Sequence, residues 1–496
     1  MKHENKKILY IVIAILVIFG VLYGLYSYAG QEAFIRTTLS GLTLGSLFFL
    51  VAAGLTLIFG LMDVLNFAHG SMFMLGAYAG WQFYTNPTFI FGVLPLVLAF
   101  VAGIMVIPLI KPELVRLKLS DSWQKRLPKL LYLAGLIVGV LAVLKFDIAG
   151  LAETAMVAIV TTSTGALAEL SPQEPLLRFM WRPVLLFISG ALVAAGVSKP
   201  GDRAEITAPE PLKNRLVLPI ILLVLTILFT FVRESASELV LLMNGNLRFA
   251  LAVIVATLFG FLLGALIEIT MIRPLYIRPF FIVLMTLGLS FVLRELVQVL
   301  WDPLAYQMVR PPLFAQPGRA STIAEWLANG SSTISIAGVT FPTYRLFVIL
   351  LGVVMFIFVT LLMTKSRLGM IIRAGVQDPQ MVEALGINVK RVFTIVFALG
   401  VALAALGGIG AAPFLPVQPM MGDQYQMQGF ITVVIGGMGS YVGAFAGAMI
   451  LGMARAFGDY FALKLQLSPT IAEASTVIIM IIVLLLRPQG LFGKKD

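Results

Sequence analysis

Few residues in this 496-residue sequence could carry out acid, base or metal chemistry. Cysteine is absent and only two histidines occur, His3 and His69, which excludes disulfides, thiol catalysis, Cys-ligated metal and a His-rich metal site. The motifs GxxxxGK[ST], HExxH and GxSxG are also missing, so the chain carries no phosphate-binding loop or familiar catalytic motif. We therefore expect a non-catalytic protein with no metal and no cofactor bound by this chain.

Charged residues within or near the apolar stretches are the remaining candidates for chemistry, here the movement of ions or protons. The main ones are Asp63, Glu268, Arg294 and Glu295. Asp63 and Glu268 lie near predicted cytoplasmic ends, where their side chains can reach water, and the other two can pair locally near an external end. A proton or sodium relay would need several acids in the middle of the apolar stretches, and the sequence does not contain them. We therefore expect an apolar cavity without fixed intramembrane charges.

The composition indicates that these residues are positioned by membrane helices. Hydrophobic residues make up 59% of the chain and charged residues only 12%, with a mean hydropathy of +0.99, whereas soluble domains contain about 25% charged residues. The apolar runs are continuous and roughly 20 residues long, unlike the alternating strands of a membrane β-barrel. The predicted fold is an all-α, polytopic integral membrane bundle.

The apolar runs predict about 12 transmembrane helices. They cover residues 8–28, 38–60, 68–85, 91–110, 128–146, 182–198, 215–232, 249–272, 279–300, 344–364, 391–412 and 470–487. Residues 1–30 start with a basic stretch and are read as a retained membrane anchor, with a signal-like segment as the alternative.

The distribution of Lys and Arg predicts the orientation. The net charge of +11 sits in short loops between apolar runs, which is the positive-inside pattern and not a nucleic-acid footprint. Cytoplasmic segments are therefore expected at 111–129, 199–215, 273–278, 365–391 and the C-terminus. The segments 147–181 and 301–343 are expected outside.

A glycine-rich break interrupts the apolar run 426–455. Gly436, Gly437 and Gly439 divide it, and the orientation of the flanking segments predicts a re-entrant pair of half-helices. A single tilted span with a flexible kink is the alternative. Gly443 and Gly447 continue a GxxxG spacing, which favours close helix packing over a role in the pathway.

One cytoplasmic segment, 365–391, contains its own helix signals. Asp378 followed by proline is a good helix start, and Gly386 fits the stop. The short helix between them presents Met381, Val382 and Leu385 for an apolar contact. Because so short a helix is marginal alone, we expect it to dock into a partner, with an interfacial loop as the alternative.

Several motifs resemble those of branched-chain amino acid permeases of ATP-binding cassette (ABC) importers, the LivH-type family, which also includes urea and short-chain amide permeases. They occur in the family's order across roughly 34–88 and 247–493: Gly41-Leu-Thr-Leu-Gly45, Asn66-Phe-Ala-His-Gly70, Met74-Leu-Gly-Ala-Tyr78, Arg273-Pro-Leu-Tyr276, Gly369-Met-Ile-Ile-Arg-Ala, Glu383-Ala-Leu-Gly-Ile-Asn388, Gly436-Gly-Met-Gly-Ser440 and Arg487-Pro-Gln-Gly-Leu-Phe492.

The chain departs from the family pattern between about 90 and 246. The expected organisation is 31–90 as the N-terminal part of a permease core, 91–246 as an insertion with about four extra spans, and 247–496 as the C-terminal part. An even number of added spans preserves the orientation of the later half.

The resemblance implies a permease subunit in the bacterial inner membrane. Its expected partners are ATPase subunits that bind ATP-Mg, a second homologous permease, an external substrate-binding protein and membrane lipid. The coupling residues would be Asp378, Met381, Val382, Glu383, Ala384, Leu385 and Gly386. Asn66, His69, Gly70 and the glycines at 436, 437 and 439 would line or gate the pathway, although a helix-end cap explains Asn66 and His69 equally well. The implied substrates are branched-chain or other hydrophobic amino acids. A urea or short-chain amide permease is the alternative, and an ion-coupled secondary transporter is less favoured.

Overall fold

The computed structural model describes residues 20, 23–62, 65–107, 121–148, 150–152, 174–197, 212–468 and 470–493. The chain forms two compact units, Met1–Trp81 with Gly245–Asp496, and Gln82–Asn244. Most of the smaller unit falls within the region expected to be an insertion. The predicted first span, 8–28, lies largely outside the described residues.

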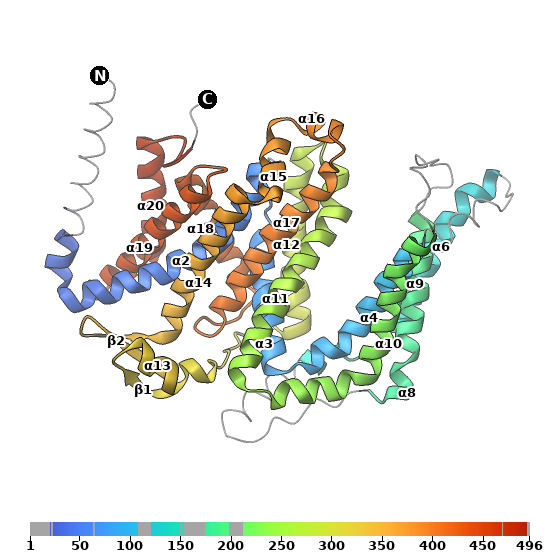
Figure 1. The fold of residues 1–496 in the computed structure, drawn as a ribbon, viewed down its shortest axis with the longest axis horizontal. Coiled ribbons are helices and arrows are strands. Elements are labelled where there is room, and N and C mark those ends of the chain that lie inside the picture. Colours follow the sequence, from blue (N-terminus) through green and yellow to red (C-terminus); the bar gives the residue numbers. More distant parts are fainter. Residues whose placement is uncertain are drawn as a thin grey trace. The chain divides into compact units, whose positions relative to one another are not determined.

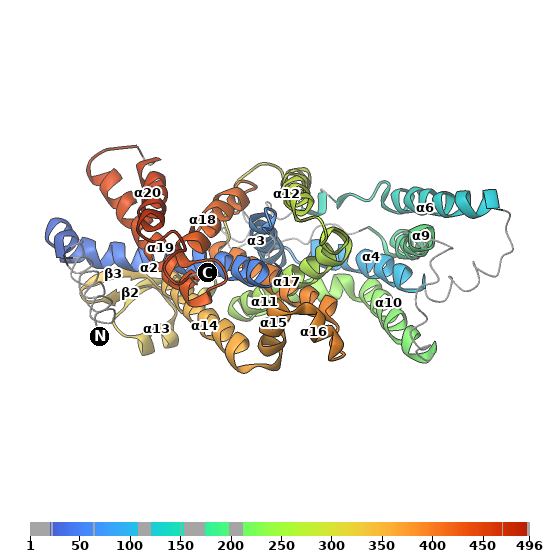
Figure 2. The ribbon, with the colours of Figure 1, turned by 90° about the horizontal axis from the view of Figure 1, so that it is seen from above.

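The larger unit is a helical bundle (Figures 1 and 2). Its long helices are α2 (Gln31–Met62), α3 (His69–Thr85), α11 (Gly245–Ile267), α12 (Pro279–Trp301), α14 (Thr343–Lys365), α17 (Val389–Ala411), α18 (Met421–Gly436), α19 (Tyr441–Lys464) and α20 (Thr470–Leu486). A helix satisfies its backbone hydrogen bonds internally, so a continuous apolar run takes this form in lipid. α11 continues into a π-helical turn, Glu268–Ile272, and a 3-10 turn, Arg273–Leu275.

The helices α2 and α17 lie at the centre of this unit and are its most buried spans. α2 packs against α19, α17, α14 and α18. Small residues permit this packing, because a Cβ added to Gly452 would lie only 2.3 Å from the Gly45 nitrogen. Phe445 fills the next layer, with its ring 5.2 Å from that of Phe49 and 4.2 Å from that of Phe356.

Ten helices in the described part of the chain are long and apolar enough to cross a membrane. Nine of them correspond to predicted spans, and the tenth is α19. The predicted spans 68–85 and 470–487 are present as α3 and α20, helices of 17 residues each. The prediction of an all-α polytopic membrane bundle is therefore confirmed.

The smaller unit is also helical in the parts that the structure describes. Its helices there are α4 (Thr88–Met105), α6 (Asp121–Val143), α8 (Leu176–Phe179), α9 (Trp181–Val197) and α10 (Leu212–Leu242). α9 packs on α4 and α6, and α10 packs on α4, around a core that includes Leu96, Phe179 and Leu186. Arg182, almost fully buried, donates to both carboxylate oxygens of Glu174 at 2.7 and 3.0 Å. This unit therefore has its own apolar core and its own ion pair.

A small sheet lies between α12 and α14, in the segment predicted to be external. β1 (Gln316–Ala320) pairs in parallel with β2 (Ser331–Ile336), and β2 pairs antiparallel with β3 (Val339–Pro342). The hairpin turn is Ala337-Gly338, both with positive φ. A short helix, α13 (Ile323–Asn329), joins β1 to β2. Figure 1 shows this sheet at one end of α14 and α15 (Arg367–Gln377) at the other.

Candidate functional site

The predicted coupling segment forms two short helices, α15 and α16 (Pro379–Ala384). The carboxylate of Asp378 accepts a hydrogen bond from the Met381 amide at 3.0 Å, so it caps α16 as the sequence predicts. Gly386 has a φ of +79° just after the helix, a conformation that favours glycine. The side chain of Asn388 caps α17 in the same way, through the Arg391 amide at 3.1 Å. Only the short segment 385–388 separates the end of α16 from the start of α17.

The helix α16 has one buried and one exposed apolar face. Val382 is 3% exposed and packs inside the chain, whereas Met381 and Leu385 are 65% and 75% exposed. These two residues are four positions apart and share a helix face. Glu383 and Ala384 are exposed beside them. Of the three apolar residues proposed to contact a partner, only Met381 and Leu385 are available for it.

A buried carboxylate ties the start of α17 to the end of α11. Glu268, 0% exposed, opens the π-helical turn. Arg273 donates to it at 2.8 and 3.2 Å, and the Thr394 hydroxyl on α17 donates at 2.7 Å. The Tyr276 hydroxyl also donates to it; burial and the adjacent carboxylate raise the pKa of Tyr276, which keeps this hydroxyl protonated. The expectation that Glu268 reaches water is wrong, because protein donors replace water around it.

Asn66 and His69 lie buried inside the bundle. His69 Nε2 is 3.2 Å from the carbonyl of Val51, which precedes the end of α2 by eleven residues, or about 16 Å of helix. The Asn66 side chain accepts from the Ala68 amide at 3.0 Å. Asn66 Nδ2 and His69 Nδ1 are buried and have no hydrogen-bond partner among the described residues.

The segment at Asn66 joins α3 to α18. Gln426 donates to the Asn66 carbonyl at 3.3 Å and accepts from the Gly70 amide. A Cβ on Gly70 would lie 2.1 Å from the carbonyl oxygen of Gly422, so these helices touch at glycine. These contacts show packing; a gating role for Asn66, His69 and Gly70 stays a prediction.

The break between α18 and α19 falls where the sequence places it. Gly437 and Gly439 have φ values of +96° and +81°, which end one helix and redirect the chain into the next. The C-terminal segment packs against this break, because the Leu491 amide donates to the Ile435 carbonyl at 2.8 Å. α18 has 16 residues, but α19 has 24, so α19 is longer than the half-helix expected from sequence.

The glycines that flank the break bring α18 and α19 together. A Cβ on Gly436 would lie 2.4 Å from the carbonyl carbon of Gly443. A Cβ on Gly447 would lie 2.8 Å from the carbonyl oxygen of Thr432. None of these glycines lines the cavity that lies among α2, α18, α19 and α20. Their proposed place in the pathway is therefore still a prediction.

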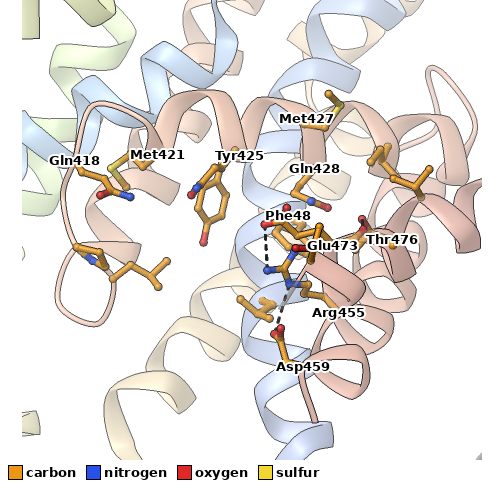
Figure 3. A pocket seen from close by; sticks show the side chains of 18 residues that line it. Phe48, Gln418, Met421, Tyr425, Met427, Gln428, Arg455, Asp459, Glu473 and Thr476 are labelled. Atoms are coloured by element: carbon orange, nitrogen blue, oxygen red, sulfur yellow. Dashed lines mark hydrogen bonds and ion pairs between the residues drawn. The ribbon is translucent and has the colours of Figure 1, made fainter. Parts of the chain in front are cut away.

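A cavity of about 620 Å³ lies among α2, α18, α19 and α20 (Figure 3). The loop between α17 and α18 contributes to its lining. This loop pairs with the segment 301–343, which is predicted to be external: the Val417 amide donates to the Tyr306 carbonyl at 2.8 Å, and the Tyr306 amide donates to the Val417 carbonyl at 2.9 Å. The cavity therefore opens in the half of the bundle away from α16. Its lining comprises Leu44, Phe48, Leu415, Pro416, Gln418, Met421, Gln424, Tyr425, Met427, Gln428, Ile431, Arg455, Asp459, Thr470, Glu473, Ala474, Thr476 and Val477.

Three charged side chains line this cavity. Arg455 forms ion pairs with Asp459 and Glu473, each at 3.5 Å. The Arg-x-x-x-Asp spacing of Arg455 and Asp459 was the available signal, since residues four apart on a helix such as α19 can pair. Glu473 comes from α20, and only the fold brings it to the other two.

Helices long and apolar enough to span a membrane, packed around a cavity lined by apolar and charged side chains, are the architecture of a polytopic membrane protein. The chain belongs to the family described as the branched-chain amino acid transport system permease component, whose model matches residues 37–121 and 129–486. That match runs through most of the region expected to be an insertion.

Three relatives show the extent of the similarity. The high-affinity branched-chain amino acid transport system permease protein LivH of Salmonella typhimurium is 31% identical over 173 residues, 35% of this chain and 54% of that protein. BraD of Pseudomonas aeruginosa, which carries the same description, is 30% identical over 251 residues, 50% of this chain and 74% of that protein. A probable LivH of Methanocaldococcus jannaschii is 30% identical over 143 residues, 27% and 43% respectively. The chain thus spans about half the length of the LivH relatives. No solved structure matches it significantly.

Proposed function

We propose that this chain is the transmembrane permease subunit of an ABC importer in the bacterial cytoplasmic membrane. It forms the pathway for branched-chain or other hydrophobic amino acids, which an external binding protein delivers. Family membership and relatives described as branched-chain amino acid permeases support this proposal. The observation that carries it is the capped helix α16, whose Met381 and Leu385 are exposed at the end expected to be cytoplasmic.

The contacts around α16 suggest how ATPase movement reaches the pathway. Met381 and Leu385 insert into a groove on an ATPase subunit, so α16 follows that subunit when ATP binds. α16 continues into α17, and Glu268 joins α17 to the end of α11 through Thr394. Because α17 is central in the bundle, its displacement repacks the helices around it. A hydrogen-bonded network between rigid helices is a physical route for such coupling.

The remaining parts of the transporter lie on partners. Two ATPase subunits bind ATP-Mg and hydrolyse it, a second homologous permease completes the pathway, and lipid surrounds the bundle. This chain is non-catalytic, contacts no nucleic acid, and has its C-terminus in the cytoplasm. The absence of a GxxxxGK[ST] motif from the sequence supports this division of labour.

The coupling assignment is tested by Met381→Asp combined with Leu385→Asp. Both side chains are exposed, so the substitutions leave the fold intact but place two charges in an apolar contact. We expect co-purification with the ATPase subunits to be lost, while yield and elution volume stay those of the wild type.

The matched control is Leu327→Asp on α13, the short helix beside the sheet at the other end of α14. Leu327 is 58% exposed, which is comparable to Met381. We expect this variant to keep its ATPase subunits. If the double α16 variant also keeps them, α16 is not the docking helix.

A further inference from the structure

The ion pairs of Arg455 are long for a charged group among membrane helices. Charge-assisted hydrogen bonds have N–O distances of about 2.7–2.9 Å, but Asp459 and Glu473 each lie 3.5 Å from the guanidinium. The guanidinium thus retains donors that a ligand in the cavity can use.

One polar atom at the cavity lacks a hydrogen-bond partner among the described residues. Gln428 Oε1 is buried and accepts no hydrogen bond from the described residues, although Gln428 lines the cavity. Figure 3 shows Gln428 on the same side of the cavity as Arg455 and Glu473. A buried acceptor without a donor costs free energy, so a ligand donor at this point would stabilise the site.

The three charged groups together carry a net charge of −1, with the positive group between two negative ones. A simple anion gains one favourable contact with Arg455 but approaches two carboxylates. A simple cation gains contacts with both carboxylates but leaves the donors of Arg455 without an acceptor. A ligand with both charges on adjacent atoms satisfies both kinds of group, and the free α-amino acid is such a ligand.

The rest of the lining is suited to an apolar side chain. Leu44 and Phe48 of α2, Ile431 of α18 and Val477 of α20 all contribute. The volume of about 620 Å³ falls within the range of about 300–1,000 Å³ that small-molecule sites occupy. A small aliphatic amino acid would fit with its side chain toward these residues.

We propose that this cavity is a binding subsite for a zwitterionic amino acid with an apolar side chain. Arg455 binds its carboxylate, while Glu473, Asp459 and Gln428 Oε1 accept from its ammonium group. This subsite deepens the proposed function and rests on it for its place in the transport cycle. The permease therefore selects substrate by its two charges, in addition to any selection by the binding protein.

The test is binding of radiolabelled leucine to the full-length chain in lipid nanodiscs, without ATPases or binding protein. Arg455→Gln removes the fork that holds the carboxylate, and Glu473→Gln, at an exposed side chain, removes an acceptor for the ammonium. We expect saturable binding by the wild type and at least about a tenfold loss of affinity in each variant.

The matched control is Arg294→Gln. Arg294 is 21% exposed, against 22% for Arg455, and it also pairs with two carboxylates, but it lies outside the cavity. This variant should bind leucine as the wild type does. The single-charge analogues 4-methylpentanoate and 3-methylbutylamine should compete at least about tenfold less well than leucine.

The two proposals fail in different ways. Absence of saturable binding, or equal binding by wild type and Arg455→Gln, overturns the subsite whether or not the chain assembles with ATPases. Equal competition by either single-charge analogue also overturns it. Charge-dependent leucine binding by a chain that recruits no ATPase would support the subsite and contradict the importer.

Discussion

At the residue scale, the bundle accommodates charge by surrounding it with donors. Glu268 is fully buried, yet Arg273, Tyr276 and Thr394 all donate to its carboxylate. Removing one partner from such a group costs more than the pair contributes, because the other charge is left without compensation. Glu268 therefore matters for stability as well as for the proposed link between α11 and α17.

We predict that Glu268→Ala lowers the free energy of unfolding by about 2–3 kcal/mol, less than for a fully buried pair because Arg273 is partly exposed. A lower apparent Tm of the purified protein would show this. Glu295→Ala, at a carboxylate 63% exposed, is the control and should melt close to the wild type. Coincident melting of Glu268→Ala and the wild type would contradict the anchoring role.

The surroundings of a residue cannot be predicted from sequence where distant segments supply them. Asp378 is predictable because its bond to the Met381 amide is local. Glu473 pairs with Arg455 only because α19 and α20 pack together. Likewise, the sequence does not show how far His69 lies from the end of α2. The chain turns back along α2 after that end, and this brings His69 beside Val51.

At the element scale, the long helices were predictable and the small sheet β1–β3 was not. Apolar runs of spanning length have no other stable form in lipid, so nine spans and the break at Gly437 could be placed from sequence. Residues Thr333–Ile336, where polar residues alternate with isoleucine, followed by Ala337-Gly338, are a hairpin signal. It escaped prediction because the strands are short and lie between two much stronger helical patterns.

The cap of α16 gives a prediction at this scale. Asp378→Ala removes a side-chain acceptor from a six-residue helix, which costs about 1 kcal/mol. If docking requires the formed helix, affinity for the ATPase subunit falls up to about fivefold, measurable by biolayer interferometry.

The control is Thr322→Ala, which removes the corresponding cap from α13, a seven-residue helix. It should cost α13 a similar amount but leave ATPase affinity unchanged. Equal losses in both variants would mean that the effect of Asp378→Ala is general and not specific to coupling.

At the scale of the whole molecule, the charge pattern predicts which end of the larger unit faces the cytoplasm, and the two ends of α14 are far enough apart to lie on opposite sides of a membrane. The sheet segment and α15 lie at opposite ends of α14 (Figure 1). The 23 residues of α14 span about 34 Å, enough for a hydrocarbon core of about 30 Å. The positive-inside pattern therefore assigns the sheet to the outside and α16 to the cytoplasm.

Because the chain contains no cysteine, this orientation can be tested with single substitutions. Ala328→Cys lies on α13 and Ala384→Cys on α16, and both positions are exposed. In intact spheroplasts, a membrane-impermeant maleimide should label the first, and the second only after permeabilisation. Labelling of Ala384→Cys in intact spheroplasts would reverse the proposed topology.

The central claim is tested most directly by ATPase activity in reconstituted vesicles. They would contain this chain, the ATPase subunits and the second permease, with binding protein loaded with leucine, loaded with urea, or empty. The importer proposal predicts that the leucine-loaded form stimulates hydrolysis well above the other two. If the ATPase subunits neither assemble with this chain nor respond to any loaded form, the chain is not their permease.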